Sequence, residues 1–588
     1  MTITIRLTAG YRENPLGLPG ARGVMLGWSV HGEGAIDGRG GVDVEVASDE
    51  DALAAGELLW RADGVRGSVV RYGGPLPGSR RALHWRVIAR DAEGAMVVST
   101  PGVAEIGLES AEDWYAGWVS APLVPLRRET WDPVPLLRRS FPLGRAPGRA
   151  RIYVTALGTY RLWVNGTEVT AESLLRPGWT DFGIRVLHQT YDATGLLHAG
   201  ENVVAVELAN GWYAGWLGLQ REPGFYGEHP ALRLQLESEE GLLLGTDGSW
   251  RCTTGEIIAS DILRGEAQDL RQAVTGWREP GFDDTGWGLV EVREEITVPI
   301  TPQPHDPVAP YREFEGRLVR AHARGPAVFD FGQNMVGWTR IRTRTHPRAD
   351  IIVRHGEMLS DDALVWRDNL RSAFQEDRYT TGDDGTHVLE SRHTLHGFRY
   401  AEVWGLVPAT PHAGLEVPDD FSITALAVGG GQRPAGAFEC SDAGLTHVSR
   451  MVEWTVRDNF IEVITDCPSG TSGSAGSATP VSSPRPPPIT STSPPSSPSS
   501  SGTRPTARRR MAWSTTTPRP SCPREAVTER PAGRTAMCDS CTWRLVAMEI
   551  SSPRRSISSR SSATWARSRG PTPPVSARSA SARISPIG

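Results

Sequence analysis

Residues 441–468, SDAGLTHVSRMVEWTVRDNFIEVITDCP, decide how the rest of the chain is understood, because the hydrophobic period changes there. Apolar residues recur at the spacing of one helix face, at Leu445, Val448, Met451, Val452, Val456 and Phe460. Ser441 and Asp442 stand just before this run and are residue types that cap a helix N-terminus. The stretch predicts an amphipathic helix within 445–463 and, from about residue 436, the start of a helical domain.

The chain before this stretch has the pattern of β-strands. Short alternating runs, such as VDVEV at 42–46 and YRLWV at 160–164, are separated by Gly, Pro and Asp turns. Asn165-Gly166 directly after the second run is a strong hairpin signal. The runs form three groups and predict a mainly β protein with three consecutive β-sandwich domains, at 1–105, 132–298 and 311–428. Such a scaffold does not by itself name a function.

The chain after Ser469 has a different composition, dominated by Ser, Pro, Arg and Thr. Its only acidic residues are Glu525, Glu529, Asp539 and Glu549. With so few apolar residues to offset chain entropy, residues 469–588 are predicted to be a disordered tail. A natural Ser/Pro-rich tail is one interpretation. A shifted reading frame is the other, because the tail begins where partners for the amphipathic helix are needed.

Codons compatible with residues 471–480, TSGSAGSATP, support the frameshift interpretation. Moved back by one base, GC-rich codons for this segment spell D-E-R-L-G-W-I-G-D-A. One base lost between Ser469 and Gly470 would join this text to Asp466-Cys467-Pro468. The restored sequence would place paired acids and a tryptophan directly after the helix.

Length, charge and cysteine usage limit the class of protein. The 588 residues give room for several domains, and the net charge of -6 does not favour a nucleic-acid partner. Six cysteines make no disulfide framework, and residues 1–6 lack the features of a secretory signal. No apolar run is long enough to span a membrane. We therefore expect a soluble, cytoplasmic protein without a membrane partner, and most of the 20 tryptophans in β-sandwich cores.

Several motifs together resemble bacterial α-L-rhamnosidases of glycoside hydrolase family 78. The catalytic signature of that family looks like Asp466-Cys-Pro468 with its restored continuation. Upstream segments resemble the family in the same order: YRENPLG at 11–17, LLRRSF at 136–141, YVTALG at 153–158, PGWTD at 177–181, NGWYAG at 210–215, FDFGQNMVGW at 329–338 and LHGFRY at 395–400. The resemblance covers about residues 1–468. It implies a fibronectin type III-like domain, an N-terminal β domain, a concanavalin-like domain and, at 436–468, the first helix of a truncated (α/α)₆ barrel.

The resemblance also implies the chemistry. An inverting glycosidase needs a carboxylic acid and a second carboxylate that activates water. In the family these are the glutamate of D-E-R-L-G-W and another glutamate far downstream, and neither is encoded in the printed frame. No catalytic residue can therefore be assigned. Asp466 matches an aspartate that grips the sugar, although a helix-end aspartate before Pro468 is the alternative. The chain as printed is predicted to be inactive.

The second β domain resembles a rhamnose-binding module in which calcium bridges protein and sugar. Asp181 is the matching candidate ligand, but Phe182 stands where another oxygen ligand is expected. A surface aspartate ending a turn is the alternative. No cofactor is expected for catalysis. The expected partners are rhamnose-containing glycosides, and the alternative function is non-catalytic carbohydrate binding.

One further motif is His355-Gly-Glu357, which follows a predicted strand. A single His and Glu in such a place are more often surface polar groups than metal ligands. We therefore expect no metal at this motif.

Overall fold

The computed structural model describes most of the chain before the predicted tail. The described residues are 3–21, 23–32, 40–122, 132–217, 223–322, 325–346, 348–371, 373–406, 417, 420–431, 437–463 and 465, with the backbone of 583–585. They belong to one compact unit, Met1–Val481 with Ala580–Gly588. Asp466, Cys467 and the predicted frame break at Ser469 lie outside the described residues. The described chain consists mostly of strands, which confirms the predicted mainly β fold.

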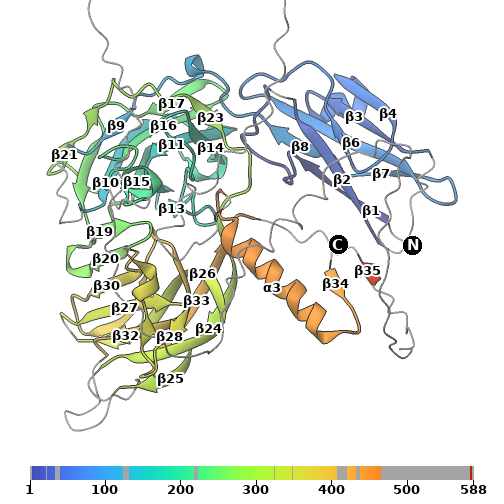
Figure 1. Cartoon of the computed structure of the whole chain (residues 1–588). Helices are drawn as coiled ribbons and strands as arrows, with labels where there is room; N and C mark the ends of the chain where they lie inside the picture. The colour runs from blue at the N-terminus through green and yellow to red at the C-terminus, as the bar shows by residue number, and fades with distance from the viewer. Residues whose placement is uncertain are drawn as a thin grey trace, which may run out of the picture. The chain divides into compact units, whose positions relative to one another are not determined.

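The first block of the chain, residues 3–105, contains two antiparallel sheets (Figure 1). Three strands form one sheet: β1 (Ile3–Ala9), β2 (Met25–Gly32) and β5 (Val69–Arg71). Five form the other: β3 (Val42–Ala47), β4 (Trp60–Val65), β6 (Ala82–Arg90), β7 (Met96–Val98) and β8 (Gly102–Glu105). Every second residue of β6 is buried, including Trp85 and Val87. A short helix, α1 (Glu50–Ala55), is capped by Asp49, whose Oδ1 accepts a hydrogen bond from the Ala52 N–H at 2.8 Å.

The second block pairs a six-stranded sheet with a seven-stranded sheet. The first holds β10 (Pro135–Leu143), β12 (Thr159–Val164), β13 (Thr167–Glu168), β15 (Gly200–Ala209), β18 (Arg251–Thr254) and β21 (Gly288–Leu289). The second holds β9 (Val119–Ser120), β11 (Ala150–Leu157), β14 (Val186–Asp192), β16 (Ala231–Ser238), β17 (Gly241–Gly245), β22 (Glu291–Val292) and β23 (Ile300–Pro302). Asn165 and Gly166 both have positive φ and join β12 to β13, which confirms the predicted hairpin.

The third block is built on a ten-stranded sheet. Its strands are β19 (Ile257–Asp261), β20 (Gly265–Asp269), β24 (Ala309–Glu315), β25 (Arg317–Ala321), β26 (Ala327–Thr345), β27 (Asp350–Gly356), β30 (Glu376–Thr380), β31 (Gly385–Glu390), β32 (His396–Trp404) and β33 (Ser422–Gly429). The long strand β26 changes register against β32 between Asp330 and Met335, and its later half also pairs with β31 and β33. β20 pairs in parallel with β30, so residues 257–269 join this sheet. They fall within 132–298, the range that the sequence pattern predicted for the second sandwich.

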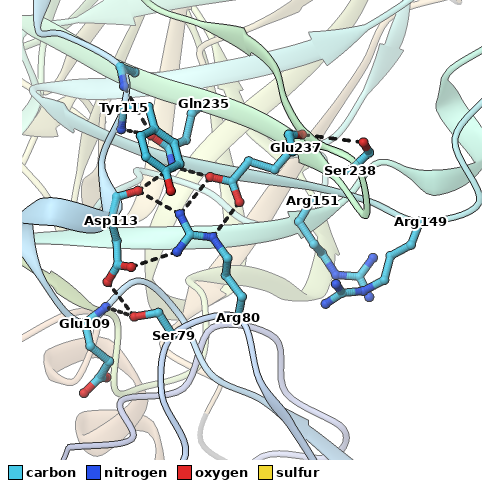
Figure 2. A network of polar contacts seen from close by, with 12 residues as sticks. Ser79, Arg80, Glu109, Asp113, Tyr115, Arg149, Arg151, Gln235, Glu237 and Ser238 are labelled. Carbon is cyan, nitrogen blue, oxygen red and sulfur yellow. Dashed lines mark hydrogen bonds and ion pairs between the residues drawn. The ribbon is translucent and has the colours of Figure 1, made fainter.

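Arg80 ties the first block to the second (Figure 2). Its guanidinium donates to Glu237 Oε2 at 2.6 Å, to Asp113 Oδ1 at 2.8 Å and to the Asp113 carbonyl at 2.8 Å. Glu237 is buried and raises the pKa of Arg80 through this hydrogen bond. Gln235 extends the network by accepting a hydrogen bond from the Tyr115 N–H at 2.8 Å. The segment between the two blocks is therefore held by charged hydrogen bonds, which are stronger than neutral ones.

Helix α3 (Ala443–Asn459), orange in Figure 1, follows the third block. The Asp442 carboxylate caps it by accepting hydrogen bonds from the Gly444 and Leu445 N–H groups, which confirms this predicted cap. Trp454 packs against Tyr311 and Phe314. The predicted apolar face is exposed, by 36 to 56%, at Leu445, Val448, Met451, Val452 and Val456. No helix within the described part of the chain is long and apolar enough to cross a membrane.

The remaining elements are short. They are α2 (Gly211–Ala214), the 3₁₀ turns at Ala111–Asp113, Thr194–Leu196, Leu270–Gln272 and Asp368–Leu370, the hairpin of β28 (Met358–Leu359) and β29 (Val365–Trp366), and the pair of β34 (Ala437–Glu439) and β35 (Arg583–Ser585). β35 comes from the predicted tail, and its three residues pair antiparallel with β34.

Candidate functional site

The chain turns back on itself where α3 ends. The Thr465 N–H donates to the Asn459 carbonyl at 2.9 Å, and this hydrogen bond closes the turn. The turn buries Ile461 and Glu462. A Cβ added at Gly178 would lie 2.4 Å from Glu462 Oε2, so the PGWTD segment at 177–181 lies directly against this carboxylate. The predicted sugar-gripping residue Asp466 comes one residue after Thr465, outside the described residues.

Glu462 is a buried carboxylate whose charge is only weakly compensated by nearby cationic side chains. Its side chain is 1% exposed and lies 3.8 Å from Arg176 Nη1 and 3.5 Å from His305 Nε2. Neither carboxylate oxygen has a hydrogen-bond partner among the described residues. Burial raises the pKa of Glu462 to about 8, against the opposing charge of Arg176. The carboxyl therefore holds its proton at neutral pH.

Asp458, on the last turn of α3, is a second carboxyl with a raised pKa. Its Oδ1 accepts a hydrogen bond from the Val336 N–H at 3.2 Å, where α3 contacts β26. Burial and, to a smaller extent, the charge of Glu357 raise the pKa of Asp458 to about 7, against the Val336 hydrogen bond. Raised carboxyl pKa values are common at functional sites but also arise in buried structural positions.

The space beside Glu462 is too small for a sugar. The cavity lined by Trp179, Trp212, Leu263, Leu395 and the 461–465 turn has a volume of about 20 Å³. This is room for about one water molecule. Trp179 and Trp212 stack on each other with ring centroids 4.5 Å apart, and both are buried. These two tryptophans are core residues, as expected for most of the tryptophans.

Asp181, the predicted calcium ligand, is exposed at the surface of the second block. Its Oδ1 accepts a hydrogen bond from the Gly183 N–H at 3.0 Å, and its carbonyl accepts from the Ile184 and Arg185 N–H groups. Phe182 is buried and offers no side-chain oxygen. Calcium takes six to eight oxygen ligands, so Asp181 alone does not make a calcium site. The geometry is that of an aspartate that caps a turn.

Within the described part of the chain, three side chains of metal-ligating type meet only at His355, Asp377 and His396. The prediction that His355 is a surface polar group is wrong, since it is fully buried. His355 Nε2 lies 3.0 Å from Thr339 Oγ1 and its Nδ1 lies 3.2 Å from the Gln375 carbonyl. Burial lowers the pKa of His355 to about 3, so this imidazole is neutral.

Asp377 and His396 complete this cluster. His396 Nε2 lies 3.1 Å from both carboxylate oxygens of Asp377, and the Glu266 N–H donates to Asp377 Oδ1 at 3.0 Å. Burial alone would raise the pKa of Asp377, but His396 and these hydrogen bonds lower it below its ordinary value. The hydrogen bonds account for the cluster as a structural network of the third block.

The described chain matches protein-family models of rhamnosidase domains along most of its length. Residues 4–110 match the Rha78A-like, N-terminal immunoglobulin domain, and residues 145–311 the alpha-L-rhamnosidase N-terminal domain. Residues 320–428 match the bacterial alpha-L-rhamnosidase concanavalin-like domain, and residues 433–471 the bacterial alpha-L-rhamnosidase 6 hairpin glycosidase domain. The chain belongs to the bacterial α-L-rhamnosidase family. This confirms the family suggested by its motifs.

Individual rhamnosidases show how far the similarity extends. An alpha-L-rhamnosidase of Streptomyces avermitilis is 38% identical over 341 residues, which are 57% of this chain and 32% of that protein. One from Formosa agariphila is 28% identical over 481 residues, 79% of this chain and 51% of the relative. The chain thus spans about a third to a half of the length of these curated relatives.

Solved rhamnosidase structures share the fold. The crystal structure of the Streptomyces avermitilis enzyme complexed with L-rhamnose superposes with a TM-score of 0.72 at 26% identity, over 80% of this chain and 62% of that one. The native enzyme from Aspergillus terreus gives a TM-score of 0.71 at 28% identity, over 80% and 54% of the two chains.

Sequence reasoning missed Glu462 and Asp458. For Glu462 the available signal was an acid inside the apolar run FIEVI at 460–464. Burial of Asp458 depends on its contact with β26, which no local pattern reveals.

Proposed function

We propose that this chain derives from an enzyme that hydrolyses terminal α-L-rhamnose from glycosides with inversion, and that the chain as printed is inactive. The observation that carries the proposal is the ordered set of rhamnosidase domain matches, the last of which ends at residue 471. Beyond that residue the sequence lacks the paired acidic residues of a glycosidase signature.

The chemistry explains why the missing acidic residues matter. Inversion requires an acid and a base held about 6.5 to 9.5 Å apart on opposite sides of the sugar. The proposed acid is the glutamate of D-E-R-L-G-W, which appears only in the restored frame, and the base is a glutamate farther downstream. Asp466 is the proposed sugar-gripping residue. Glu462 does not replace the acid, because among the described residues the space beside it holds about 20 Å³, too little for a sugar.

The exposed apolar face of α3 supports the proposal that further barrel helices belong beside it. Five apolar side chains along this face are 36 to 56% exposed: Leu445, Val448, Met451, Val452 and Val456. An amphipathic helix is stabilised mainly by burial of this face against other elements.

The decisive experiment compares two chains on p-nitrophenyl α-L-rhamnoside. One is the printed sequence, and the other continues in the restored frame after Ser469 through the end of that frame. We expect release of nitrophenol only from the second chain. A matched control replaces the glutamate of D-E-R-L-G-W by glutamine in the restored chain and should lose a factor of about a hundred to ten thousand in rate. Turnover by the purified printed chain would refute the inactivity, and an inactive, folded restored chain would refute the frameshift.

A second proposed function is rhamnose binding by the second block without turnover. It is supported by the match of residues 145–311 to the alpha-L-rhamnosidase N-terminal domain and by the exposed carboxylate of Asp181. The single carboxylate does not fit a complete calcium site, so calcium dependence is the sharper question. Calorimetry with L-rhamnose, with and without calcium, for the chain and its Asp181→Ala variant answers it. Equal binding in all four experiments would exclude calcium bridging at Asp181.

We also propose a cytoplasmic location. The described cysteines, Cys252 and Cys440, are both free thiols. Free thiols are typical of a reducing compartment. Alkylation of intact cells with a membrane-impermeant thiol reagent should leave the protein unlabelled.

A further inference from the structure

The third block contains a pocket that neither the family chemistry nor the predicted sites use. It has a volume of about 680 Å³ and is lined by residues of β27, β29 and β32 and by residues of 360–371 and 373–374. Volumes of about 300 to 1,000 Å³ are typical of small-molecule sites. Helix α3 contacts β26, β33 and β34, and none of these strands lines the pocket.

A buried carboxylate organises one wall of this pocket. Glu402 Oε1 accepts hydrogen bonds from Trp404 Nε1 at 3.0 Å and from Arg354 Nη1 at 3.4 Å. Its Oε2 accepts from the Val365 N–H at 3.1 Å, which fixes strand β29. Glu402 is 4% exposed. One carboxylate therefore holds an indole, a guanidinium and a strand in fixed positions, which is the preorganisation a binding site needs.

Aromatic side chains supply apolar surface in the same pocket. Trp366 is 38% exposed and Phe374 is 44% exposed, although both are large apolar residues. Trp404 is half-buried, with the Arg354 guanidinium 5.3 Å from its ring centroid. An indole or phenyl ring offers a large apolar contact surface, and its side chain loses little entropy on binding. The C–H faces of pyranose rings are complementary to such surfaces.

The charges that line the pocket are balanced. Three arginines and three carboxylates lie on its walls: Arg354, Arg367, Arg371, Asp362, Asp368 and Glu402. Two of the arginines are already engaged, since Arg354 Nε donates to Glu376 at 2.7 Å and Arg367 donates to the Phe374 carbonyl at 2.9 Å. The pocket thus offers many hydrogen-bonding groups with no net charge, which does not favour an anionic ligand.

The backbone around the pocket is strained on its exposed side. Arg371 is exposed and has φ 59° and ψ -106°, a conformation that residues with a Cβ rarely adopt. Strained backbone of this kind is concentrated at ligand clamps and switch regions. Of the three arginines that line the pocket, Arg371 is the exposed one, so its guanidinium is accessible to a ligand that enters.

We propose that this pocket is an accessory binding site for a neutral saccharide. A pyranose ring would lie on the exposed faces of Trp366 and Phe374, and its hydroxyl groups would exchange hydrogen bonds with Arg371 and the acidic rim. The site would hold a glycan chain on the third block, and it requires neither a catalytic barrel nor calcium. It is thus separate from both proposed functions.

The test measures saccharide binding by the full chain. Binding is detected by calorimetry and by saturation-transfer NMR, both in the presence of a calcium chelator. The probes are the disaccharide α-L-rhamnosyl-(1→2)-D-glucose, L-rhamnose and D-galacturonic acid. We expect the disaccharide to bind and Trp366→Ala and Arg371→Ala each to weaken binding at least about tenfold, a loss of about 1.4 kcal/mol. Trp366 lies on a surface hairpin, so the fold should survive its truncation.

Two controls distinguish this pocket from binding elsewhere on the chain. Tyr11→Ala removes an aromatic side chain that is 75% exposed in the first block, and it should leave binding unchanged. Asp181→Ala tests the second block. Loss of binding in Asp181→Ala with none in Trp366→Ala would overturn the proposal. Tighter binding of D-galacturonic acid than of the disaccharide would also overturn it, as would the absence of disaccharide binding up to about 10 mM.

Discussion

Asp377 in the third block and Glu462 after α3 are both almost completely buried carboxylates, yet their environments shift their pKa values in opposite directions. Asp377 lies 3.1 Å from His396 Nε2 and accepts the Glu266 N–H, and its pKa is lowered. Among the described residues, Glu462 has only the more distant Arg176 and His305 as charged partners, and its pKa is raised to about 8. Burial penalises the charged form in both places, and close hydrogen-bond donors decide which form wins.

The apolar surfaces of the same two regions differ in the same way. In the third block the apolar side chains of β26, such as Val328 and Ile341, are fully buried. On α3 the apolar face is exposed, as Val448 shows at 54%. The core of the third block around β26 and Asp377 is therefore finished by both criteria. The region of α3 and Glu462 has the features of an element that further packing would complete.

The largest expected effect comes from breaking the finished network. Asp377→Ala leaves His396 buried without its partner, and such a loss costs about 3 to 5 kcal/mol. Urea unfolding at pH 7 should show this decrease in the transition of the third block. Asp383→Ala is the matched control, because its side chain is 78% exposed, and it should change stability by less than about 0.5 kcal/mol. If Asp377→Ala lowers stability as little as Asp383→Ala does, the network contributes no stability.

A smaller effect, dependent on pH, is expected at Glu462. Its folded pKa of about 8 lies above its ordinary value of 4.5, so its contribution to stability is fully present below about pH 4.5 and is lost as the pH rises through 8. Each pKa unit corresponds to about 1.4 kcal/mol. Glu462→Gln should therefore stabilise the protein by at least about 2 kcal/mol at pH 9 relative to pH 5. Scanning calorimetry at the two pH values measures the difference.

The control for this pH dependence is Glu453→Gln. Glu453 lies on α3, is 55% exposed and pairs with Arg457 four residues later. Its replacement should give the same small change at pH 5 and pH 9. If Glu462→Gln instead destabilises the protein more at pH 9 than at pH 5, the pair with Arg176 lowers the pKa of Glu462, and the two carboxylates behave alike.

Local signals in the sequence predicted local structure well. The cap at Asp442 and the turn at Asn165-Gly166 depend on residues within a few positions, and the structure has both. His355 was misplaced although a signal existed. It lies in β27 with period two from Ile351 and Val353, which are buried, so the alternation places His355 on the same buried face.

Other features depend on contacts between distant segments. The parallel pairing of β20 with β30 joins residues more than a hundred positions apart, and no periodicity within 265–269 indicates it. The accessory pocket likewise combines Arg354, Trp366 and Glu402 from three strands. Of the predicted site, Asp181 is placed on the surface, whereas Asp466 lies outside the described residues and remains a prediction.

The smallest expected effect tests the exposed face of α3 directly. Val448→Ser replaces a half-exposed apolar side chain that has little contact to lose, so stability should change by no more than about 0.5 kcal/mol. Val353→Ser, at a fully buried position of β27, is the matched change, and it should cost several times as much because it leaves both a cavity and a buried hydroxyl. The two variants are compared by urea unfolding at several protein concentrations. A loss of about 2 kcal/mol or more for Val448→Ser would show that this face is covered in solution, and dependence of that loss on concentration would identify a second chain as the cover.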